Sequence, residues 1–440
     1  MRNRTQEQYL KISVFVITLV MIVLRFLLNE KGRVTPDSIR FMRQAHVFPE
    51  IDNTTAPLLY PLFIKVFTVF TDEFWSSKIV GILCYLFMVF FAWKKKFYWR
   101  ESLLVGALFS MISLFAATLS ETLFLPFLFV FFYVARNVLL EKYSKILSVF
   151  LLSLSVILLF NIRYSGLFFM GGLFAFGVLN YKKSFAKIYI ISSIIGFAFV
   201  AGYKLFFIDV FNQNYVNKFL EIGLKPTSLL VKEFFLAIGT SFNPFIHILN
   251  PNGGILNVGI LGIGFLNIAF FTFIFIKNKL SATEKMMVFL SVFGMICSFL
   301  IQYFYQTDAL DYRLLAPFTF GIWLVYFKKL HQIFGKLVFA IAFLSLMTGF
   351  VFSWLSRGNY LENRKLMKEF LVKEKLMDSK IYYYRPIKDE NFSSSKISEI
   401  ISTINPRVYI TEKPEDSLKK EVLTKFKIES KVKMNKNKFQ

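Results

Sequence analysis

Residues 33–61 read RVTPDSIRFMRQAHVFPEIDNTTAPLLYP and form the first polar interval after a long apolar run. The interval contains an early carboxylate, Asp37, and then a basic segment with helix-like spacing that includes Arg40 and Arg43. It ends in the apolar and aromatic sequence PLLYP. The interval thus contains more charged and aromatic residues than a simple connector between two helices needs. If the chain crosses a membrane, this interval lies at the level of the lipid headgroups. We therefore interpret the rest of the chain as a scaffold that holds the interval over a membrane-embedded pocket.

The composition of the chain is typical of a membrane protein. Of its 440 residues, 55% are hydrophobic and 19% are aromatic, with 57 phenylalanines, whereas soluble domains are clearly less apolar. The excess lies in repeated runs of about 18 or more residues, which is long enough to cross roughly 30 Å of hydrocarbon. A soluble fold would need a large core made only of fully apolar helices, and we exclude it for that reason.

The net charge of +24 would indicate nucleic-acid binding in a soluble protein. Here the basic residues cluster at the ends of the apolar runs, as expected for cytoplasmic loops, and we predict no nucleic-acid partner. The two cysteines, Cys84 and Cys297, lie inside apolar runs and are predicted to be buried thiols. The histidines, His46, His247 and His331, do not have metal-ligand spacing, and we assign no metal-ligating residues.

The apolar runs predict an α-helical polytopic membrane protein with about eleven transmembrane helices. The short basic N-terminus is predicted to stay in the cytoplasm, and with this count the C-terminus lies outside and every short basic cluster lies on the cytoplasmic side. The predicted spans are 12–28, 75–93, 103–119, 122–138, 146–160, 165–179, 188–208, 255–276, 286–305, 314–327 and 337–354.

Two further apolar stretches are not counted as spans. The stretch 57–70 is short, and we predict a helix that lies partly in the membrane interface. The stretch 229–249 is half apolar and is interrupted by Lys232, Glu233 and Pro244, so a re-entrant or interfacial pair fits it better than a spanning helix. Counting it as a span would move the two basic clusters that follow it to the outer side, against the charge rule. The sequence itself leaves both forms open.

We divide the chain into two parts. Residues 1–355 are predicted to form the transmembrane domain, with a first outer loop at 29–74 and another at 209–254. Residues 356–440 are polar and are predicted to form a small extracytoplasmic α/β region. In that region, short strand-like runs at 380–384 and 407–411 alternate with helix-like runs at 361–377 and 395–404.

Ionisable residues lie at the predicted outer ends of several spans. Besides Asp37, they include Glu121, Arg163, Asp311 and Arg313, and the predicted topology puts all five on one face. Each residue alone is typical of a solvated turn. Ionisable groups at membrane depth are costly, however, and so indicate function. Together they predict a pocket for the phosphate of an anionic lipid.

Five short motifs follow one another along this face, namely PDS at 36–38, PLLYP at 57–61, SETLF at 120–124, RYSG at 163–166 and YRLLAP at 312–317. Their order resembles that of bacterial GT-C glycosyltransferases. These are polytopic enzymes similar to the protein O-mannosyltransferases and to the aminoarabinose transferase of lipid A. The resemblance covers about residues 35–317.

The resemblance implies an inverting transfer of a hexosyl or mannosyl-type sugar from a polyprenyl-phosphate donor to a lipid, glycan or protein acceptor. It places the reaction on the outer face of the bacterial cytoplasmic membrane, among the membrane lipids. Asp37 matches the first-loop carboxylate of the resembled enzymes, which acts as general base or orients the acceptor hydroxyl. Arg163 and Arg313 are the candidates for holding the leaving phosphate. The remaining candidates for substrate binding are Glu121, Tyr60 and Asp311.

The sequence departs from the resembled pattern at one place. Many of these enzymes have adjacent acids in the first loop, whereas Asp37 is followed by Ser38. This leaves the identity of the base and a requirement for a divalent metal open. A second interpretation of Asp37 is structural, because an Asp between a Pro and a helical run is also a good N-cap.

Two other functions fit parts of the sequence. An envelope polysaccharide polymerase or ligase has a similar number of spans, and 209–254 would be its large outer loop. A lipid or sugar transporter, such as a flippase, is typically built from internal repeats with broken helices. We find no repeat at any period, and the sugar, the acceptor and the lipid carrier are left open by the sequence.

Overall fold

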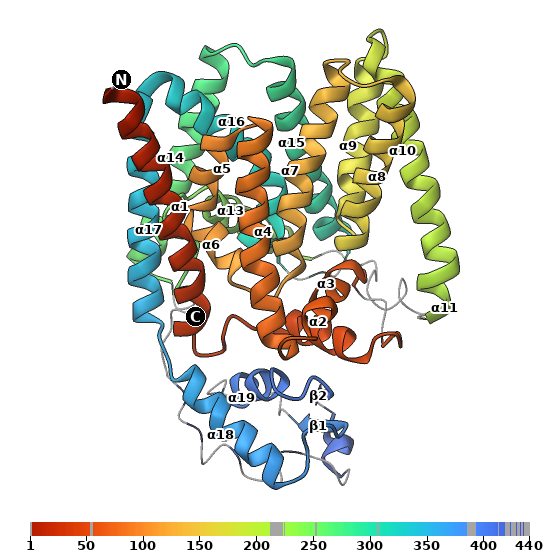
Figure 1. Ribbon diagram of the computed structural model, residues 1–440, viewed down its shortest axis with the longest axis vertical. Helices are drawn as coiled ribbons and strands as arrows, with labels where there is room; N and C mark the ends of the chain where they lie inside the picture. Colours follow the sequence, from red (N-terminus) through yellow and green to blue (C-terminus); the bar gives the residue numbers. More distant parts are fainter. Residues whose placement is uncertain are drawn as a thin grey trace.

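The computed structural model describes residues 2–52, 56–211, 223, 225–250, 253–305, 307, 309–384, 393–411, 413–418, 423, 428, 432 and 434. It consists of a large helical bundle with a small α/β region beyond one end (Figure 1). The outer loop predicted at 209–254 falls partly outside the described residues.

The bundle contains the following helices, with their bounds. They are α1 (Arg2–Leu28), α2 (Pro36–Val47), α3 (Leu59–Phe67), α4 (Glu73–Lys95), α5 (Trp99–Gly106), α6 (Phe109–Phe115), α7 (Ser120–Leu139), α8 (Lys145–Ile162), α9 (Gly166–Leu179), α10 (Ser184–Tyr203), α11 (Asp209–Phe211), α13 (Thr227–Ser241), α14 (Ile255–Lys277), α15 (Ala282–Phe304), α16 (Tyr312–Phe334) and α17 (Val338–Leu355). A π-helical turn, η1 (Lys204–Ile208), joins α10 to α11, and a 3₁₀ turn, η2 (Gly335–Leu337), joins α16 to α17.

The predicted fold class, a multi-pass α-helical membrane protein, is confirmed. Within the described residues, eight helical stretches are long and apolar enough to cross a membrane. The last of them, Tyr312–Leu355, contains both α16 and α17, and α9 is a shorter apolar helix. Large apolar side chains such as Ile146 and Ile255 are almost fully exposed, as expected for groups that face hydrocarbon rather than water.

The predicted span 103–119 is not one continuous helix, and that prediction was wrong. The chain forms two short helices, α5 and α6, and Leu108 between them is extended with ψ 135°. The Phe109 amide instead donates a hydrogen bond to Ser345 Oγ of α17 at 2.8 Å. Every residue from 101 to 120 is buried, and non-helical backbone is tolerated at membrane depth where protein encloses it.

The stretch 229–249 forms half a helix followed by irregular chain. α13 ends at Ser241, and Asn243 then organises the backbone, because its Oδ1 accepts hydrogen bonds from the amides of Phe245 and Ile246 at 2.8 and 2.9 Å. Its Nδ2 donates to the Ile260 carbonyl of α14 at 2.8 Å. These contacts satisfy backbone groups that a continuous helix would satisfy itself. The arrangement is consistent with the re-entrant interpretation.

The helices α1 and α17 lie side by side and run in the same direction. Lys336, just before α17, donates from Nζ to Gln6 Oε1 near the start of α1 at 3.0 Å. At the other end of both helices, the Gly358 amide donates to the Leu28 carbonyl at 3.0 Å. The C-terminal region therefore leaves the bundle at the end where α1 leads into α2 (Figure 1).

The two ends of the bundle are named here by one residue each. The Asp37 end is the end where α1 finishes and α2 and α3 lie. The Glu284 end is the opposite one, where α1 begins and where α15 starts beside the last turns of α16. At the Glu284 end, Lys328 and Lys329 lie 2.6 and 3.0 Å from the Glu284 carboxylate. Which end faces the cytoplasm stays a prediction from the basic clusters.

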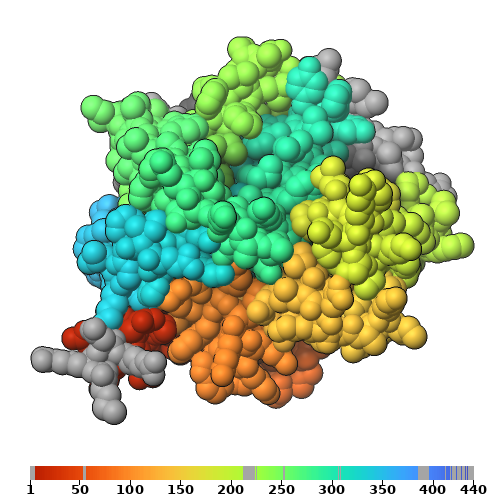
Figure 2. Space-filling model, turned by 90° about the horizontal axis from the view of Figure 1, so that it is seen from above, coloured from red at the N-terminus to blue at the C-terminus, as the bar shows by residue number. Residues whose placement is uncertain are grey.

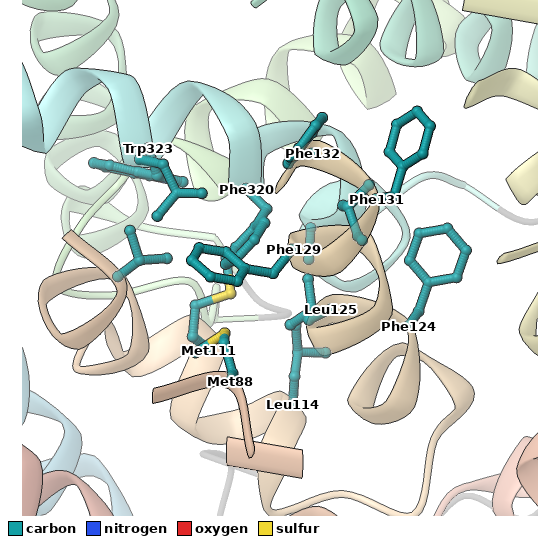
Figure 3. Packing of buried hydrophobic residues seen from close by; sticks show 14 of the residues in the cluster. Met88, Met111, Leu114, Phe124, Leu125, Phe129, Phe131, Phe132, Phe320 and Trp323 are labelled. Carbon is teal, nitrogen blue, oxygen red and sulfur yellow. The ribbon is translucent and has the colours of Figure 1, made fainter. Parts of the chain in front are cut away.

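The core of the bundle is centred on α7 and α16. Figure 3 shows Phe129 of α7 close to Phe320 of α16, and these two side chains, like those of Phe132 and Trp323, are almost fully buried. The two helices approach closely at Gly321, where a Cβ atom would lie only 3.0 Å from Phe132 Cζ of α7. Since interiors packed in this way are rigid, the first turns of α7 and α16 are fixed relative to each other.

The C-terminal region packs as a small α/β unit against the Asp37 end. Its elements are α18 (Tyr360–Lys373), β1 (Ile381–Tyr384), α19 (Ser393–Ser402) and β2 (Val408–Thr411), followed by a 3₁₀ turn, η3 (Pro414–Leu418). The two strands pair in parallel with Ile381 opposite Val408, and both residues belong to the unit's own apolar core. Salt bridges join the unit to the bundle, including Lys31 to Glu399 at 2.6 Å and Lys396 to Glu30 at 3.2 Å.

Candidate functional site

Asp37 lies in the first turn of α2 but does not cap the helix. The N-cap is Thr35, whose amide donates to Ser38 Oγ at 3.0 Å, and Pro36 occupies the first helical position. The N-cap interpretation of Asp37 is therefore wrong, because the Thr and Ser side chains already fill that role. The carboxylate is 41% exposed, and its position in the first turn is favoured by the helix dipole.

Arg313, in the first turn of α16, links three carboxylates from different parts of the chain. Its Nη1 donates to Asp37 Oδ2 at 2.9 Å. Its Nε lies 3.6 Å from Glu121 Oε1 and 3.9 Å from Asp311 Oδ2. Three predicted acids thus meet around the guanidinium of Arg313, and its planar fork of donors suits such an arrangement.

Glu121 is the buried centre of the same network. Its side chain is 1% exposed, and Arg163 Nη1 lies 2.6 Å from Glu121 Oε1. Ser120 donates from Oγ to Glu121 Oε2 at 3.3 Å, while Arg163 Nε donates to Ser165 Oγ at 3.1 Å. A buried carboxylate requires such partners to offset its loss of hydration. Glu121 therefore holds both arginines in place at the rigid ends of α7, α8 and α16.

The two other predicted residues have different surroundings. Asp311 caps α16, because its Oδ1 accepts a hydrogen bond from the Leu314 amide at 2.9 Å, yet its side chain stays 48% exposed. Tyr60 of α3 is fully buried, with its ring 5.1 Å from that of Phe41. Burial raises the pKa of the Tyr60 hydroxyl well above its usual value, and the Glu121 charge adds to the rise. Tyr60 thus lies behind the network, away from solvent.

A pocket of about 270 Å³ opens beside the network. Its polar lining comes from Arg33, Thr240, His247, Asp311 and Tyr312, and its apolar lining comes mainly from α13 and the chain that follows it. Arg33 donates from Nη2 to the Ser113 carbonyl at 3.2 Å and to Tyr312 Oη at 3.3 Å. The Arg33 Nε is buried and has no hydrogen-bond partner in the part of the chain that the structure describes. The pocket therefore contains a donor that an anionic group can use.

His247 faces the same pocket as a neutral ring. Its centroid lies 3.9 Å from that of Tyr312, and neither ring nitrogen has a hydrogen-bond partner among the described residues. Burial lowers the pKa of His247 well below its usual value, and the charges of Arg25 and Arg33 lower it further. The imidazole is therefore uncharged at neutral pH and can accept or donate one hydrogen bond.

The sequence analysis missed Arg33, His247 and Tyr312 as pocket residues. Arg33 is the first residue of the polar interval and Tyr312 directly precedes Arg313. Both could therefore have been predicted as pocket residues from their positions next to the candidate residues. His247 had no such signal, because only the irregular chain after α13 brings it there. Among the described residues, no group of three or more His, Cys, Asp or Glu side chains could hold a metal ion. The carboxylate of Asp37 faces Arg313 and Arg40 instead.

Comparisons with known proteins gave matches only among solved structures, since no family model and no curated protein matches the chain. The chain is similar to ArnT from Cupriavidus metallidurans in two structures, one bound to undecaprenyl phosphate and one in the apo state. Each shows 12% identity over 91% of this chain and 86% of ArnT, with TM-scores of 0.43 and 0.45. It is also similar to the Archaeoglobus fulgidus oligosaccharyltransferase tethered with an acceptor peptide, with 13% identity and a TM-score of 0.48. That match covers 93% of this chain and 64% of the archaeal one.

Proposed function

We propose that this protein is a membrane glycosyltransferase of the GT-C type that transfers a hexosyl sugar, such as mannose, from a polyprenyl-phosphate donor to an envelope acceptor. The observation that supports it best is the position of Asp37. This half-exposed carboxylate is held by Arg313 at the edge of a buried network of charges, beside a pocket with further basic and aromatic groups. Reactive carboxylate and phosphate-binding groups are thus within reach of one lipid-linked substrate.

The proposed reaction is a single displacement with inversion at the anomeric carbon. The acceptor hydroxyl oxygen attacks that carbon and forms the new glycosidic bond. The bond between the anomeric carbon and the phosphate oxygen breaks, and polyprenyl phosphate leaves with its electron pair. Asp37 takes the hydroxyl proton as general base, a role that carboxylates fill where a reacting group is within hydrogen-bond reach.

The arginines have different roles in binding the leaving phosphate. Arg313 has its Nη1 on Asp37 and lies at the exposed edge, so in our proposal it contacts the phosphate as negative charge develops there. Arg163 is turned toward Glu121 and Ser165 and contributes a fixed positive charge behind it. Arg33 offers a further guanidinium inside the pocket, and Asp311 lies at the pocket's rim.

Reconstitution separates an enzyme from a transporter. Purified protein in liposomes is supplied with lipid-linked sugars extracted from a deletion strain, and the lipids are followed by mass spectrometry. A transferase releases polyprenyl phosphate in proportion to the glycosylated acceptor. Movement of intact lipid-linked sugar across the bilayer, without cleavage of the sugar–phosphate bond, would instead identify a flippase. In cells, the deletion strain is expected to accumulate the lipid-linked donor.

We also propose that transfer takes place on the outer face of the cytoplasmic membrane, and this orientation is tested separately. Reporter fusions at Lys96, Lys183, Lys279 and Lys329 are expected to score cytoplasmic, and a fusion after Tyr360 is expected to score external. The physical reason is the gathering of short basic loops at the Glu284 end. An external signal from the four lysine sites would place Asp37 on the cytoplasmic face and overturn the proposed orientation.

A further inference from the structure

A second cavity lies at the Glu284 end, across the bundle from Asp37. It has a volume of about 720 Å³ and is lined by the link between α4 and α5, by α7, and by the facing turns of α15 and α16. Figure 2 looks onto this end, where the orange segments near residue 100 meet the green and cyan segments farther along the chain. The proposed transfer reaction makes no use of this cavity.

The lining of this cavity is rich in positive charge. It includes Lys96, Arg100, Arg136 and Lys328, against one acid, Glu101. Two of these cations are already paired, Arg100 with Glu101 and Lys328 with a glutamate of α15. Lys96 and Arg136 have no carboxylate within 4.0 Å in the described part of the chain. The cavity therefore has two cations available for an anion.

Two donors in the same place lack hydrogen-bond partners. The Tyr98 hydroxyl and the Arg100 Nε are buried, and neither finds an acceptor among the residues that the structure describes. Both residues line the cavity. Buried polar groups are almost always paired, so these donors are consistent with an acceptor supplied by a ligand.

An apolar groove of about 460 Å³ adjoins the cavity. It runs between α1 and α4, with Phe15 on one side and Val89 on the other, and it shares Trp93 and Trp99 with the cavity. Lys11 lies at its end, with its Nζ 4.8 Å from the Trp99 ring centroid. Tryptophan at the junction of an apolar and a charged surface is typical of the membrane interface.

We propose that the cavity and the groove together bind one anionic phospholipid. The phosphate group contacts Arg136 and Lys96, and an acyl chain lies in the groove beside Trp93. Basic pockets between transmembrane helices bind anionic headgroups in this manner. A free phosphate would use the cavity but would leave the groove empty, so the shared tryptophans favour a lipid.

The test uses the purified full-length protein, stripped of lipid in detergent. Dioleoyl phosphatidylglycerol is titrated while the thermal unfolding temperature is followed, with dioleoyl phosphatidylcholine and glycerol phosphate as separate arms. Phosphatidylglycerol is expected to stabilise the wild-type protein, and the other two ligands are not. The double variant Lys96→Gln, Arg136→Gln is expected to bind phosphatidylglycerol about 30-fold more weakly, from the loss of two interfacial charges.

A matched control removes the same charge elsewhere at the same end. Lys142 and Lys145 are exposed and lie outside the cavity, so the double variant Lys142→Gln, Lys145→Gln is expected to keep its affinity. Equal losses in both double variants would show diffuse electrostatics and overturn the proposal. Equal stabilisation by glycerol phosphate or by phosphatidylcholine would overturn it as well.

The groove is tested by a second pair of variants. Trp93→Ala removes the shared wall and is expected to lower the amount of phosphatidylglycerol that remains bound in native mass spectrometry. Trp354→Ala removes a comparably exposed tryptophan on α17 and is expected to have no effect. The lipid-bound fraction is measured on intact protein, so a variant with lower stability still reports binding. An unchanged lipid content in Trp93→Ala would sink the assignment of the groove.

Discussion

The two ends of the bundle each bury one glutamate against two cations, but the two clusters are built from different parts of the chain. Glu284 belongs to a capping box with Ser281, whose amide donates to Glu284 Oε2 at 2.7 Å, and its cations are the consecutive residues Lys328 and Lys329. Glu121 instead meets arginines from the ends of two separate helices. One of these, Arg313, extends the cluster to carboxylates on α2 and before α16.

The difference shows what distinguishes a structural cluster from a site. At the Glu284 end the acid caps its own helix and its cations come from one neighbouring helix, so the cluster is complete as it stands. At the Asp37 end, two carboxylates remain about half exposed after all the pairings are made. A protein gains little stability from exposed charges. Asp37 is therefore better explained by contact with a substrate than by folding, whereas Asp311 also caps α16.

The largest expected effect of any single change is at Asp37. Asp37→Asn keeps the shape of the side chain and the start of α2, but it cannot take a proton. Sugar transfer is expected to fall by about 10²–10⁴, the typical contribution of a general base. The measurement is the turnover of purified protein on lipid-linked donor, together with donor binding.

The control for Asp37 lies on the next turn of the same helix. Arg40→Gln removes a half-exposed charge 3.5 Å from Asp37 Oδ1 and is expected to reduce turnover by less than about tenfold, as for a surface pair. Near wild-type transfer by Asp37→Asn would contradict the assignment and make Asp311 the next candidate. A folded variant that binds donor and is inactive supports it.

The second effect concerns the arginines around Glu121. Replacing Arg313 by Lys keeps the charge but loses the fork that reaches Asp37 and Glu121 together. Donor affinity is expected to fall about tenfold or more, the value of one charged hydrogen bond. Arg163→Lys is expected to weaken binding less, because Arg163 faces Glu121 and Ser165. Both effects are measured as the affinity of the purified variants for polyprenyl phosphate. Unchanged affinity in both Lys variants would show that the arginines do not bind the donor.

The third prediction compares the two buried glutamates directly. Glu121→Gln leaves two arginines without their buried partner, which is expected to cost about 3–5 kcal/mol of stability and to lower transfer, though by less than Asp37→Asn does. Glu284→Gln is expected to cost less, because the half-buried Lys328 can turn toward water, and to leave the activity of the remaining folded protein unchanged. The stability of each variant is measured by thermal unfolding, and its activity is measured as turnover. Equal losses of activity would mean that the two ends do not differ in function.

The sequence predicted the bundle and the grouping of the candidate residues on one face because both depend on local patterns. Run length and basic clusters indicated the helices, and order along the chain brought Asp37, Glu121, Arg163 and Arg313 to one face. The break between α5 and α6 could not be seen, because a serine of α17 far along the chain replaces the lost helical bond. The position of His247 in the wall of the pocket could not be predicted either, because it depends on the long-range packing of α13.

The smallest expected effect tests how the C-terminal region holds α2. Tyr409 of β2 donates from its hydroxyl to Asp52 Oδ1 at 3.1 Å, and the Arg43 guanidinium lies 4.3 Å from the same ring. Arg43 Nε also donates to Asp52 Oδ2 at 2.7 Å, so α2 is tied to β2 by two kinds of contact.

Two substitutions separate these contacts. Tyr409→Phe removes only the hydrogen bond and is expected to cost about 1 kcal/mol of stability with unchanged turnover. Tyr409→Ala also removes the ring beneath Arg43, a contact worth about 0.5–2 kcal/mol more. The Ala variant is expected to lower turnover a few-fold, because Asp37 lies on the same short helix as Arg43. Tyr382→Ala removes a neighbouring ring on β1 that stacks on Tyr409 and serves as the matched control, with turnover expected to stay near wild type. A loss of turnover in the Phe variant as large as in the Ala variant would show that the hydrogen bond alone positions α2.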